Sequence, residues 1–351
     1  MDQLNFDEQA VIEFLTGLLN TPSPTGYYAE AIAYVEQAFV ALDIPELALT
    51  QTTKGALLIT WPGTQNNAPR GLTAHVDTLG LMVKEIKSSG RLQVTQLGGF
   101  MWQAVEFEGV TIHTANGQRY RGTVLPVKAS VHVHRDASEL KLTPDTIEIR
   151  IDARTASADE TRKLGIEVGD FVFLDPRVEV TDTGFIRSRH LDDKAGVAAI
   201  YGAFHALKAA NLQPAQTVTA LIAQFEEVGH GGAAGFPPDL HELLAIDMAA
   251  VGQGQNSDEF SVGLCVKDAS GPYHPVLTAK LRQLAEEADI PYKPDIYPYY
   301  ASDGTAYWRA GGGAQVALAG PGVDASHSYE RTHTESVIHT AHLIARYVLA
   351  G

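Results

Sequence analysis

The 351-residue sequence has a single cysteine, Cys265, and is poor in basic residues. One cysteine excludes an internal disulfide and any zinc or iron–sulfur site built from several thiolates. Lysine and arginine total 26 against 42 aspartate and glutamate residues, so the formal net charge is −16. This deficit of positive charge argues against non-specific binding to nucleic acid or to anionic lipid.

Long apolar runs are also missing from the sequence. No run approaches the roughly 20 apolar residues that a membrane-spanning helix needs, so we expect no membrane segment. The first residues, Met1–Glu8, are acidic and lack the basic region of a secretory signal. We therefore expect a cytoplasmic protein.

The pattern of apolar residues indicates two kinds of structure. Helical periodicity at 10–18, 28–42, 193–209, 276–288 and 335–349 alternates with short buried strands at 56–61, 71–76, 218–225, 243–246 and 315–319. From 82 to 185 the apolar runs are short and alternating, with a hairpin signal at Asn116–Gly117. We predict an α/β domain made of residues 1–81 and 186–351, with a small β-barrel or sandwich inserted at 82–185.

Histidine and carboxylate side chains follow several of the predicted strands. In open α/β sheets, ligands bind outside the carboxyl ends of the strands. His75 and Asp77 form a pair in which the imidazole can bind zinc and the carboxylate can hold its tautomer. A strand-end histidine capped by an aspartate is the alternative interpretation.

Glu226 and Glu227 are adjacent carboxylates at the end of an apolar strand. Such a pair is costly without a cation or hydrogen-bond donors, because the two charges repel each other. Metal-assisted hydrolysis uses both groups, one as a metal ligand and the other to take a proton from water. A solvated loop is the alternative, and the apolar strand and the glycine-rich turn beside the pair disfavour it.

Two further acidic segments fit the same chemistry. Asp192 and Asp193 precede a predicted helix, where an aspartate can cap the helix or bridge two metals. Asp247 interrupts an apolar stretch, which favours a metal ligand over a hydrogen-bonded structural aspartate.

Further histidines lie in the last loop and in the inserted segment. His327 and His333 compete for one role in the last loop. We interpret His132 and His134, two residues apart in the inserted segment, as solvent-face or interface residues.

Six segments together resemble the M42 family of metallo-aminopeptidases, the group of glutamyl and tetrahedral aminopeptidases. They are Pro22–Gly26, Ala74–Gly80, Leu191–Gly196, Glu226–Gly229, Ile246–Asp247 and His327–Ser328. They occur in the family's order and span nearly the whole chain. The resemblance implies a three-layer α/β/α catalytic domain of the zinc-peptidase type, with an inserted β-barrel domain for dimerisation and assembly.

The resemblance also implies a set of site residues. The implied metal ligands are His75, Asp192, Glu227 and Asp247, with Asp192 bridging two metals, and the implied catalytic residues are Glu226 as general base and Asp77. The implied cofactor is two divalent cations per subunit, Zn²⁺ first, with Co²⁺ or Mn²⁺ as alternatives.

Two parts of the family pattern are altered in this sequence. His327 falls in the family's His-Ser position, but Arg331 replaces the glutamate that usually follows four residues later, and Glu330 stands one residue early. His333 therefore stays open as the alternative last ligand. Asp303 lies near the family's Thr-Asp-Ala segment, which implies a substrate-binding role.

The implied activity is removal of N-terminal residues from small peptides by a metal-bound hydroxide, with Glu226 as the base. Thr78 stands where the family commonly has an acidic residue, as in a bacterial branch associated with a dipeptide-amide osmoprotectant. The alternative function is therefore an amidohydrolase of a small blocked peptide or dipeptide-amide compatible solute, and a non-catalytic metal-binding protein is a third. The resemblance further implies a homo-oligomer built from dimers, up to a dodecamer.

Overall fold

The computed structural model describes residues 4–351 and divides into two compact units. One unit combines the residues up to Asp77 with Val178–Gly351, and the other consists of Thr78–Arg177. The chain returns to the first unit earlier than its pattern of apolar residues indicates. The reason is that β10 (Glu179–Val180) and β11 (Phe185–Ser188) pair with each other and with the sheet of that unit.

The first unit contains six α-helices in its described residues. They are α1 (Glu8–Leu19), α2 (Ala29–Ala41), α4 (Leu191–Ala209), α5 (Pro275–Glu287), α6 (Asp303–Arg309) and α7 (Thr334–Leu349). Its other strands are β1 (Ala48–Gln51), β2 (Leu57–Trp61), β3 (Gln65–His75), β12 (Gln216–Ala223), β13 (Glu242–Ile246), β14 (Ala249–Val251), β15 (Val262–Asp268), β16 (Gly271–Pro272), β17 (Tyr292–Ile296), β18 (Gln315–Asp324) and β19 (Glu330–His333). The helices and strands predicted for this unit all occur, with ends shifted by a few residues. The additional elements are α6 and the strands β1, β10, β11, β14, β15, β16, β17 and β19.

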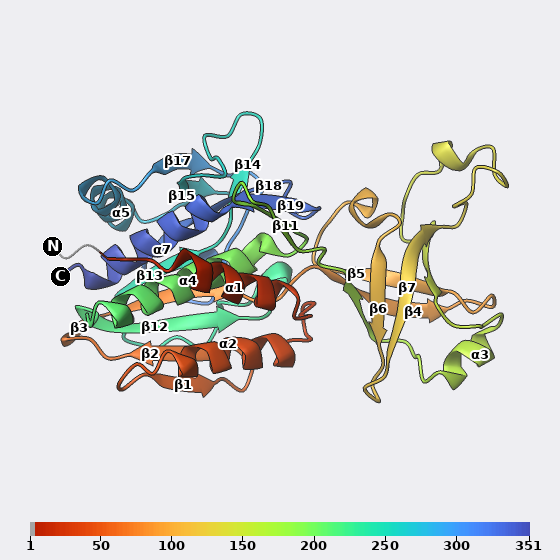
Figure 1. The fold of residues 1–351 in the computed structure, drawn as a ribbon, viewed down its shortest axis with the longest axis horizontal. Coiled ribbons are helices and arrows are strands. Elements are labelled where there is room, and N and C mark those ends of the chain that lie inside the picture. The colour runs from red at the N-terminus through yellow and green to blue at the C-terminus, as the bar shows by residue number, and fades with distance from the viewer. Residues whose placement is uncertain (1–3) are drawn as a thin grey trace. The chain divides into compact units, whose positions relative to one another are not determined.

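A 13-stranded mixed sheet forms the centre of the first unit (Figure 1). Its main path runs β1-β2-β12-β3-β13-β18-β19-β11-β10. Strand β3 lies between β12 and β13 and runs parallel to both, and β13 also pairs in parallel with β18. The carboxyl ends of these four strands therefore meet at one edge of the sheet, where ligands bind in open α/β folds.

Alternate side chains of β13 point into two different apolar cores. Leu244 and Ile246 belong to the larger core, which includes buried side chains of α1, α2, α4, α5 and α7. Leu243 and Ala245 belong to the other core, against which Trp308 of α6 packs. Successive side chains of a strand point to opposite faces of the sheet, so helices cover both faces. This arrangement confirms the predicted three-layer α/β/α fold.

The second unit is a closed barrel in the order β4-β5-β8-β7-β6-β9. Its elements are β4 (Gly80–Ile86), β5 (Leu92–Leu97), η1 (Trp102–Val105), β6 (Gly109–His113), β7 (Arg119–Pro126), η2 (Ala137–Glu139), β8 (Ile147–Ile151), α3 (Ala158–Lys163) and β9 (Phe171–Leu174). Strands β6 and β7 form the predicted hairpin, and Gly117 in its turn has a φ of +83°. Glycine is favoured there because it has no side chain to clash in the left-handed region. The barrel confirms that part of the predicted fold class.

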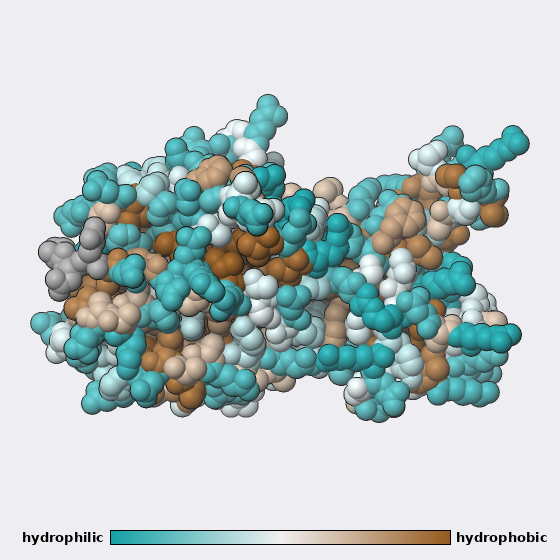
Figure 2. Space-filling view, in the orientation of Figure 1, coloured by the Kyte–Doolittle hydropathy of each residue, from teal (hydrophilic) through white to brown (hydrophobic). Residues whose placement is uncertain are grey.

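The face of the molecule drawn in Figure 2 is mostly polar. Hydrophilic side chains cover most of the face in Figure 2, and brown side chains gather in an area near α1. Within residues 4–351, none of the helices has the length and apolar character needed to cross a membrane.

Candidate metal centre

The predicted site residues meet at the carboxyl edge of the central sheet. His75 is the last residue of β3 and pairs with Ala223, the last residue of β12. Glu226 and Glu227 follow β12 in a short 3-10 helix, and Asp247 follows β13 directly. The parallel register therefore brings together groups that are more than 150 residues apart in the sequence.

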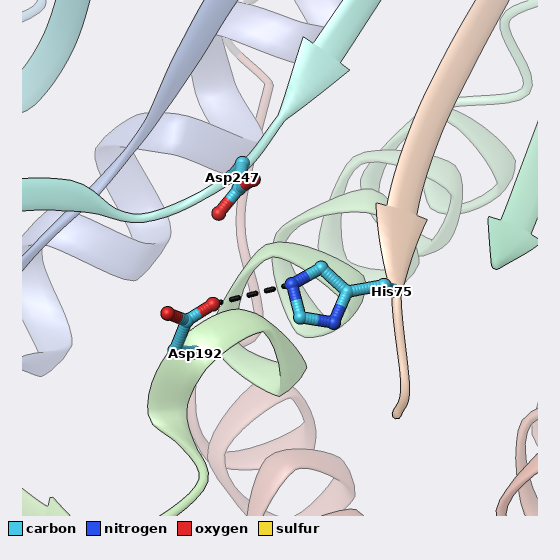
Figure 3. A group of neighbouring side chains, drawn as sticks. All are labelled: His75, Asp192 and Asp247. Atoms are coloured by element: carbon cyan, nitrogen blue, oxygen red, sulfur yellow. Dashed lines mark ion pairs between the residues drawn. The ribbon is translucent and has the colours of Figure 1, made fainter. Parts of the chain in front are cut away.

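His75, Asp192 and Asp247 form the first group of donor atoms, in which one ligand atom from each side chain lies within 4.8 Å of the others. Figure 3 shows the three side chains pointing toward one another from the end of β3, the start of α4 and the segment after β13. Nε2 of His75 lies 3.2 Å from Oδ1 of Asp192. All three residues are buried.

Asp192, Glu227 and His327 form the second group, again within 4.8 Å. Nε2 of His327 lies 3.4 Å from Oδ2 of Asp192 and 3.5 Å from Oε2 of Glu227. Asp192 thus presents one carboxylate oxygen to His75 and the other to His327. It is the residue that the two groups share.

The start of α4 and the last loop present these side chains from irregular backbone. Asp192 and Asp193 have non-helical backbone angles, so regular helix begins at Lys194. His327 has a φ of +62°. This left-handed conformation costs a non-glycine residue about 1–3 kcal/mol and persists only where the surroundings fix it.

Asp77 holds the first group and the Glu226–Glu227 segment in place. Its carboxylate accepts hydrogen bonds from the backbone N–H of Glu226 at 3.1 Å and of Glu227 at 3.3 Å. Nδ1 of His75 lies 2.9 Å from the Asp77 carbonyl oxygen and 3.5 Å from its carboxylate. A proton on Nδ1 leaves Nε2 free to bind a metal, which is the usual arrangement around ligating histidines. Asp77 therefore holds candidate site residues in position, and its predicted catalytic role stays a prediction.

Glu330 performs a similar task for the second group. Its side chain is fully buried, and its two carboxylate oxygens accept hydrogen bonds from the backbone N–H of Asp192 at 3.0 Å and of His327 at 2.9 Å. One carboxylate thus fixes two of the three members of the group.

Lys194 lies beneath the centre with no exposed surface. Its ammonium donates hydrogen bonds to the carbonyl oxygens of Leu18 at 2.9 Å and Thr21 at 2.7 Å. Burial lowers its pKa to about 7, and the charge of Asp77 partly opposes this shift. Lys194 ties the start of α4 to the end of α1.

The centre contains more buried carboxyl groups than basic side chains that could balance their charge. Burial raises the pKa of Glu227 to about 8, and the nearby charge of Asp192 adds to the shift. Burial and Asp192 raise the pKa of Asp247 to about 8 in the same way. For Asp192 burial acts in the same direction, but the adjacent imidazoles of His327 and His75 leave its pKa below the usual value. Clustered buried carboxylates of this kind are stabilised by a bound cation.

The residues present fit divalent cations. Two ligands on one tetrahedral zinc lie about 3.4 Å apart, given bond lengths near 2.1 Å, and the distances of 3.2, 3.4 and 3.5 Å within the two groups match that spacing. Among residues 4–351, the buried atoms without a hydrogen-bond partner include Nε2 of His75 and Oε1 of Glu227. Imidazole nitrogens and carboxylate oxygens are the ligands that zinc takes besides thiolates.

The profile of a known family covers most of this sequence. The profile described as M42 glutamyl aminopeptidase matches residues 55–343. The chain belongs to the M42 peptidase family. It is 47% identical over 337 residues to the putative aminopeptidase YhfE of Bacillus subtilis (strain 168), and the match covers 96% of each chain.

Solved structures agree with the fold of this M42 peptidase. An aminopeptidase from the archaeon Desulfurococcus kamchatkensis superposes with a TM-score of 0.86 at 20% identity, over 98% of this chain and 96% of that one. The TET1 peptidase of Pyrococcus horikoshii superposes with a TM-score of 0.82 at 20% identity, over 97% of this chain and 100% of that one. That peptidase is described as assembling into a tetrahedron or a large octahedral shell.

The family settles the class of activity. M42 aminopeptidases are metal-dependent hydrolases of peptide bonds, so this chain is a peptidase. The two donor groups are the candidate metal-binding residues of this M42 chain.

The remaining predicted site residues of this M42 peptidase lie at the edge of the centre or away from it. His333 ends β19 with both ring nitrogens engaged, Nε2 with the Thr183 carbonyl at 2.9 Å and Nδ1 with the N–H of Glu335 at 3.2 Å. Asp303 accepts a hydrogen bond from the N–H of Gly232, so it contacts the loop that follows Glu227. Its substrate-binding role stays a prediction.

His132 and His134 belong to the second unit and take no part in either donor group. His132 is exposed and His134 is half-buried.

Sequence reasoning missed the positioning roles of Glu330 and Lys194. For Glu330 the available signal was its one-residue offset from the family's glutamate, which was read only as a departure from the pattern. For Lys194 the signal was a lysine directly after two aspartates at a helix start, where a basic residue is unfavourable for the helix dipole.

Proposed function

We propose that this M42 chain is a dinuclear metal-dependent aminopeptidase that removes N-terminal residues from small peptides, with Glu226 as general base. The observation that carries the proposal is the position of Asp192, which offers one carboxylate oxygen to each of the two donor groups. A carboxylate shared in this way is suited to bridging two cations, as two-metal hydrolases require.

Each of the two cations would have three protein ligands. One cation would be held by His75, Asp192 and Asp247, and the other by Asp192, Glu227 and His327. Zn²⁺ suits this nitrogen and oxygen donor set best, and Co²⁺ and Mn²⁺ are the alternatives. When bound, such cations lower the pKa of water to about 7 and polarise the carbonyl group of the scissile bond.

Glu226 is the group best placed to move the proton. Its Oε2 lies 3.7 Å from Nε2 of His75, and its side chain lines the same cavity as Asp192, Glu227 and Asp247. Its backbone N–H donates a hydrogen bond to Asp77, which fixes the backbone from which the side chain extends. Glu226 takes a proton from the attacking water and delivers it to the leaving amine.

The acidic cavity also favours substrates with a free N-terminus. A protonated α-amine can pair with the carboxylates of the cavity wall that contains Glu226 and Asp247. A neutral α-amine can instead bind a cation through its nitrogen. An N-acetylated peptide offers neither. This distinguishes the aminopeptidase from the amidohydrolase alternative.

We also propose that the chain forms a homo-oligomer, as the TET1 peptidase of Pyrococcus horikoshii does. The barrel unit would make the dimer contacts. Light scattering of the purified protein tests this, because a monomer of 37.7 kDa in solution would contradict it.

The test of the function uses Glu226→Gln on free and N-acetylated dipeptide amides. Loss of general-base catalysis lowers rates by about 10²–10⁴-fold, so we expect kcat to fall in that range while the metal content stays the same. Glu46→Gln is the matched control, because Glu46 is exposed and lies outside the centre. Full turnover by a metal-replete Glu226→Gln enzyme would remove Glu226 as the base. Cleavage of the acetylated substrates by the wild type would favour the amidohydrolase.

A further inference from the structure

The cavity that contains the donor groups continues past them along a second wall. The cavity has a volume of about 710 Å³, which is enough for a side chain and the peptide that follows it. The second wall is formed by Met248, Ala250, Tyr297, Pro298, Tyr300 and Ala301. Met248 follows β13, Ala250 belongs to β14, and the other four residues follow β17.

The two tyrosine hydroxyls of these six residues are already engaged in hydrogen bonds within the protein, and Tyr299, which also lines the cavity, is exposed to solvent. The hydroxyl of Tyr300 donates to the Met248 carbonyl oxygen at 3.0 Å, and the hydroxyl of Tyr297 lies 2.7 Å from Oγ of Ser257. The amide of Gln255, at the rim, donates to the Ile296 carbonyl oxygen at 2.7 Å. Rings and methyl groups are therefore what the wall offers to a ligand.

Positive charge is missing from the cavity lining. Among the described residues that line it, none is a lysine or an arginine. Arg331, on the neighbouring strand β19, is paired with Glu259 at 2.6 Å. A negatively charged side chain that entered this wall would lose part of its hydration without gaining a cationic side chain as a partner.

We infer that the second wall receives the side chain of the substrate's N-terminal residue, and that it selects bulky uncharged side chains and rejects glutamate and aspartate. This inference rests on the proposed function. Apolar and aromatic side chains such as those of leucine, methionine and phenylalanine gain by burial against Met248 and the tyrosine rings. The chain would thus differ in specificity from an aminopeptidase that acts on N-terminal glutamate.

The experiment measures kcat/KM for dipeptide amides that begin with leucine, methionine, phenylalanine, glutamate or aspartate and are otherwise identical. We expect the three uncharged residues to exceed the two acidic residues by about 100-fold or more, as a discrimination of roughly 3 kcal/mol implies. Equal or higher values for the acidic substrates would overturn the inference.

A charge introduced into the wall gives a second test. Ala250→Lys places an ammonium on the second wall, and we expect it to raise the glutamate-to-leucine ratio of kcat/KM at least tenfold. Ala209→Lys is the matched control, because Ala209 is exposed at the far end of α4, and it should leave the ratio unchanged. An unchanged ratio in a folded Ala250→Lys enzyme would count against the wall as the specificity site.

A binding measurement separates failure of this inference from failure of the proposed function. Calorimetry with free leucine and free glutamate requires no turnover. If no peptide is cleaved, the proposed function fails, and binding of leucine but not glutamate would still support the pocket assignment. Binding of glutamate with equal or higher affinity would refute the assignment.

Discussion

Replacing Glu330 with glutamine perturbs the second donor group without touching a ligand. The carboxylate accepts one backbone N–H on each oxygen, from Asp192 and from His327. Glutamine has one oxygen, so one buried N–H would face the amide NH₂ instead. Leaving a buried N–H without an acceptor costs about 1–3 kcal/mol, and we expect the free energy of unfolding of the metal-free protein to fall by that amount.

The same change should weaken metal binding. Residues that hold metal ligands in place typically alter affinity by about 10–100-fold when mutated, so we expect the dissociation constant of the more weakly held zinc to rise in that range. Competition against a chromophoric chelator measures the affinity, and urea unfolding measures the stability. Glu46→Gln serves as the control for an exposed carboxylate. A Glu330→Gln protein with wild-type zinc affinity and wild-type unfolding midpoint would refute the positioning role.

Two further predictions concern stability. Lys194→Met removes the donor of two buried carbonyl oxygens, and we expect a loss of about 2–4 kcal/mol in urea unfolding; an unchanged midpoint would contradict this. Burial, together with the charge of Arg346, lowers the pKa of His342 to about 4. Because its unfolded pKa is about 6.5, neutral His342 stabilises the fold above that pH, and the stabilisation is lost as pH falls from about 6.5 to about 4. After discounting for partial exposure, we expect about 1–2 kcal/mol, so His342→Leu should show a flatter pH dependence of stability than the wild type over that range.

Much of the fold could be predicted because its elements carry local signals. The apolar positions of α1, α4 and α7 recur at helical spacing, and the buried strands are short apolar runs bounded by turns. The short helix α6 escaped prediction, because its seven residues are too few to show a periodic apolar face. Residues 178–185, which include β10, fall in the predicted inserted segment but belong to the first unit. The pairing of β11 with β19 joins residues about 150 apart and leaves no local signal.

The site could be predicted as far as strand ends and residue types allow. Parallel strands place their carboxyl ends together, so His75, Glu227 and Asp247 could be grouped from the sequence. From spacing alone the choice between His327, which the resemblance favours, and His333 could not be made, because the path of the chain between β18 and β19 leaves no local signal. Nor could the role of Glu330, whose hydrogen bond to Asp192 joins positions 138 residues apart.

The most direct test of the central claim is a zinc-loaded crystal measured at the zinc absorption edge. We predict two anomalous peaks per chain, one between His75, Asp192 and Asp247 and the other between Asp192, Glu227 and His327, with a different oxygen of Asp192 facing each peak. A single peak, or two peaks that do not share Asp192, would contradict the account.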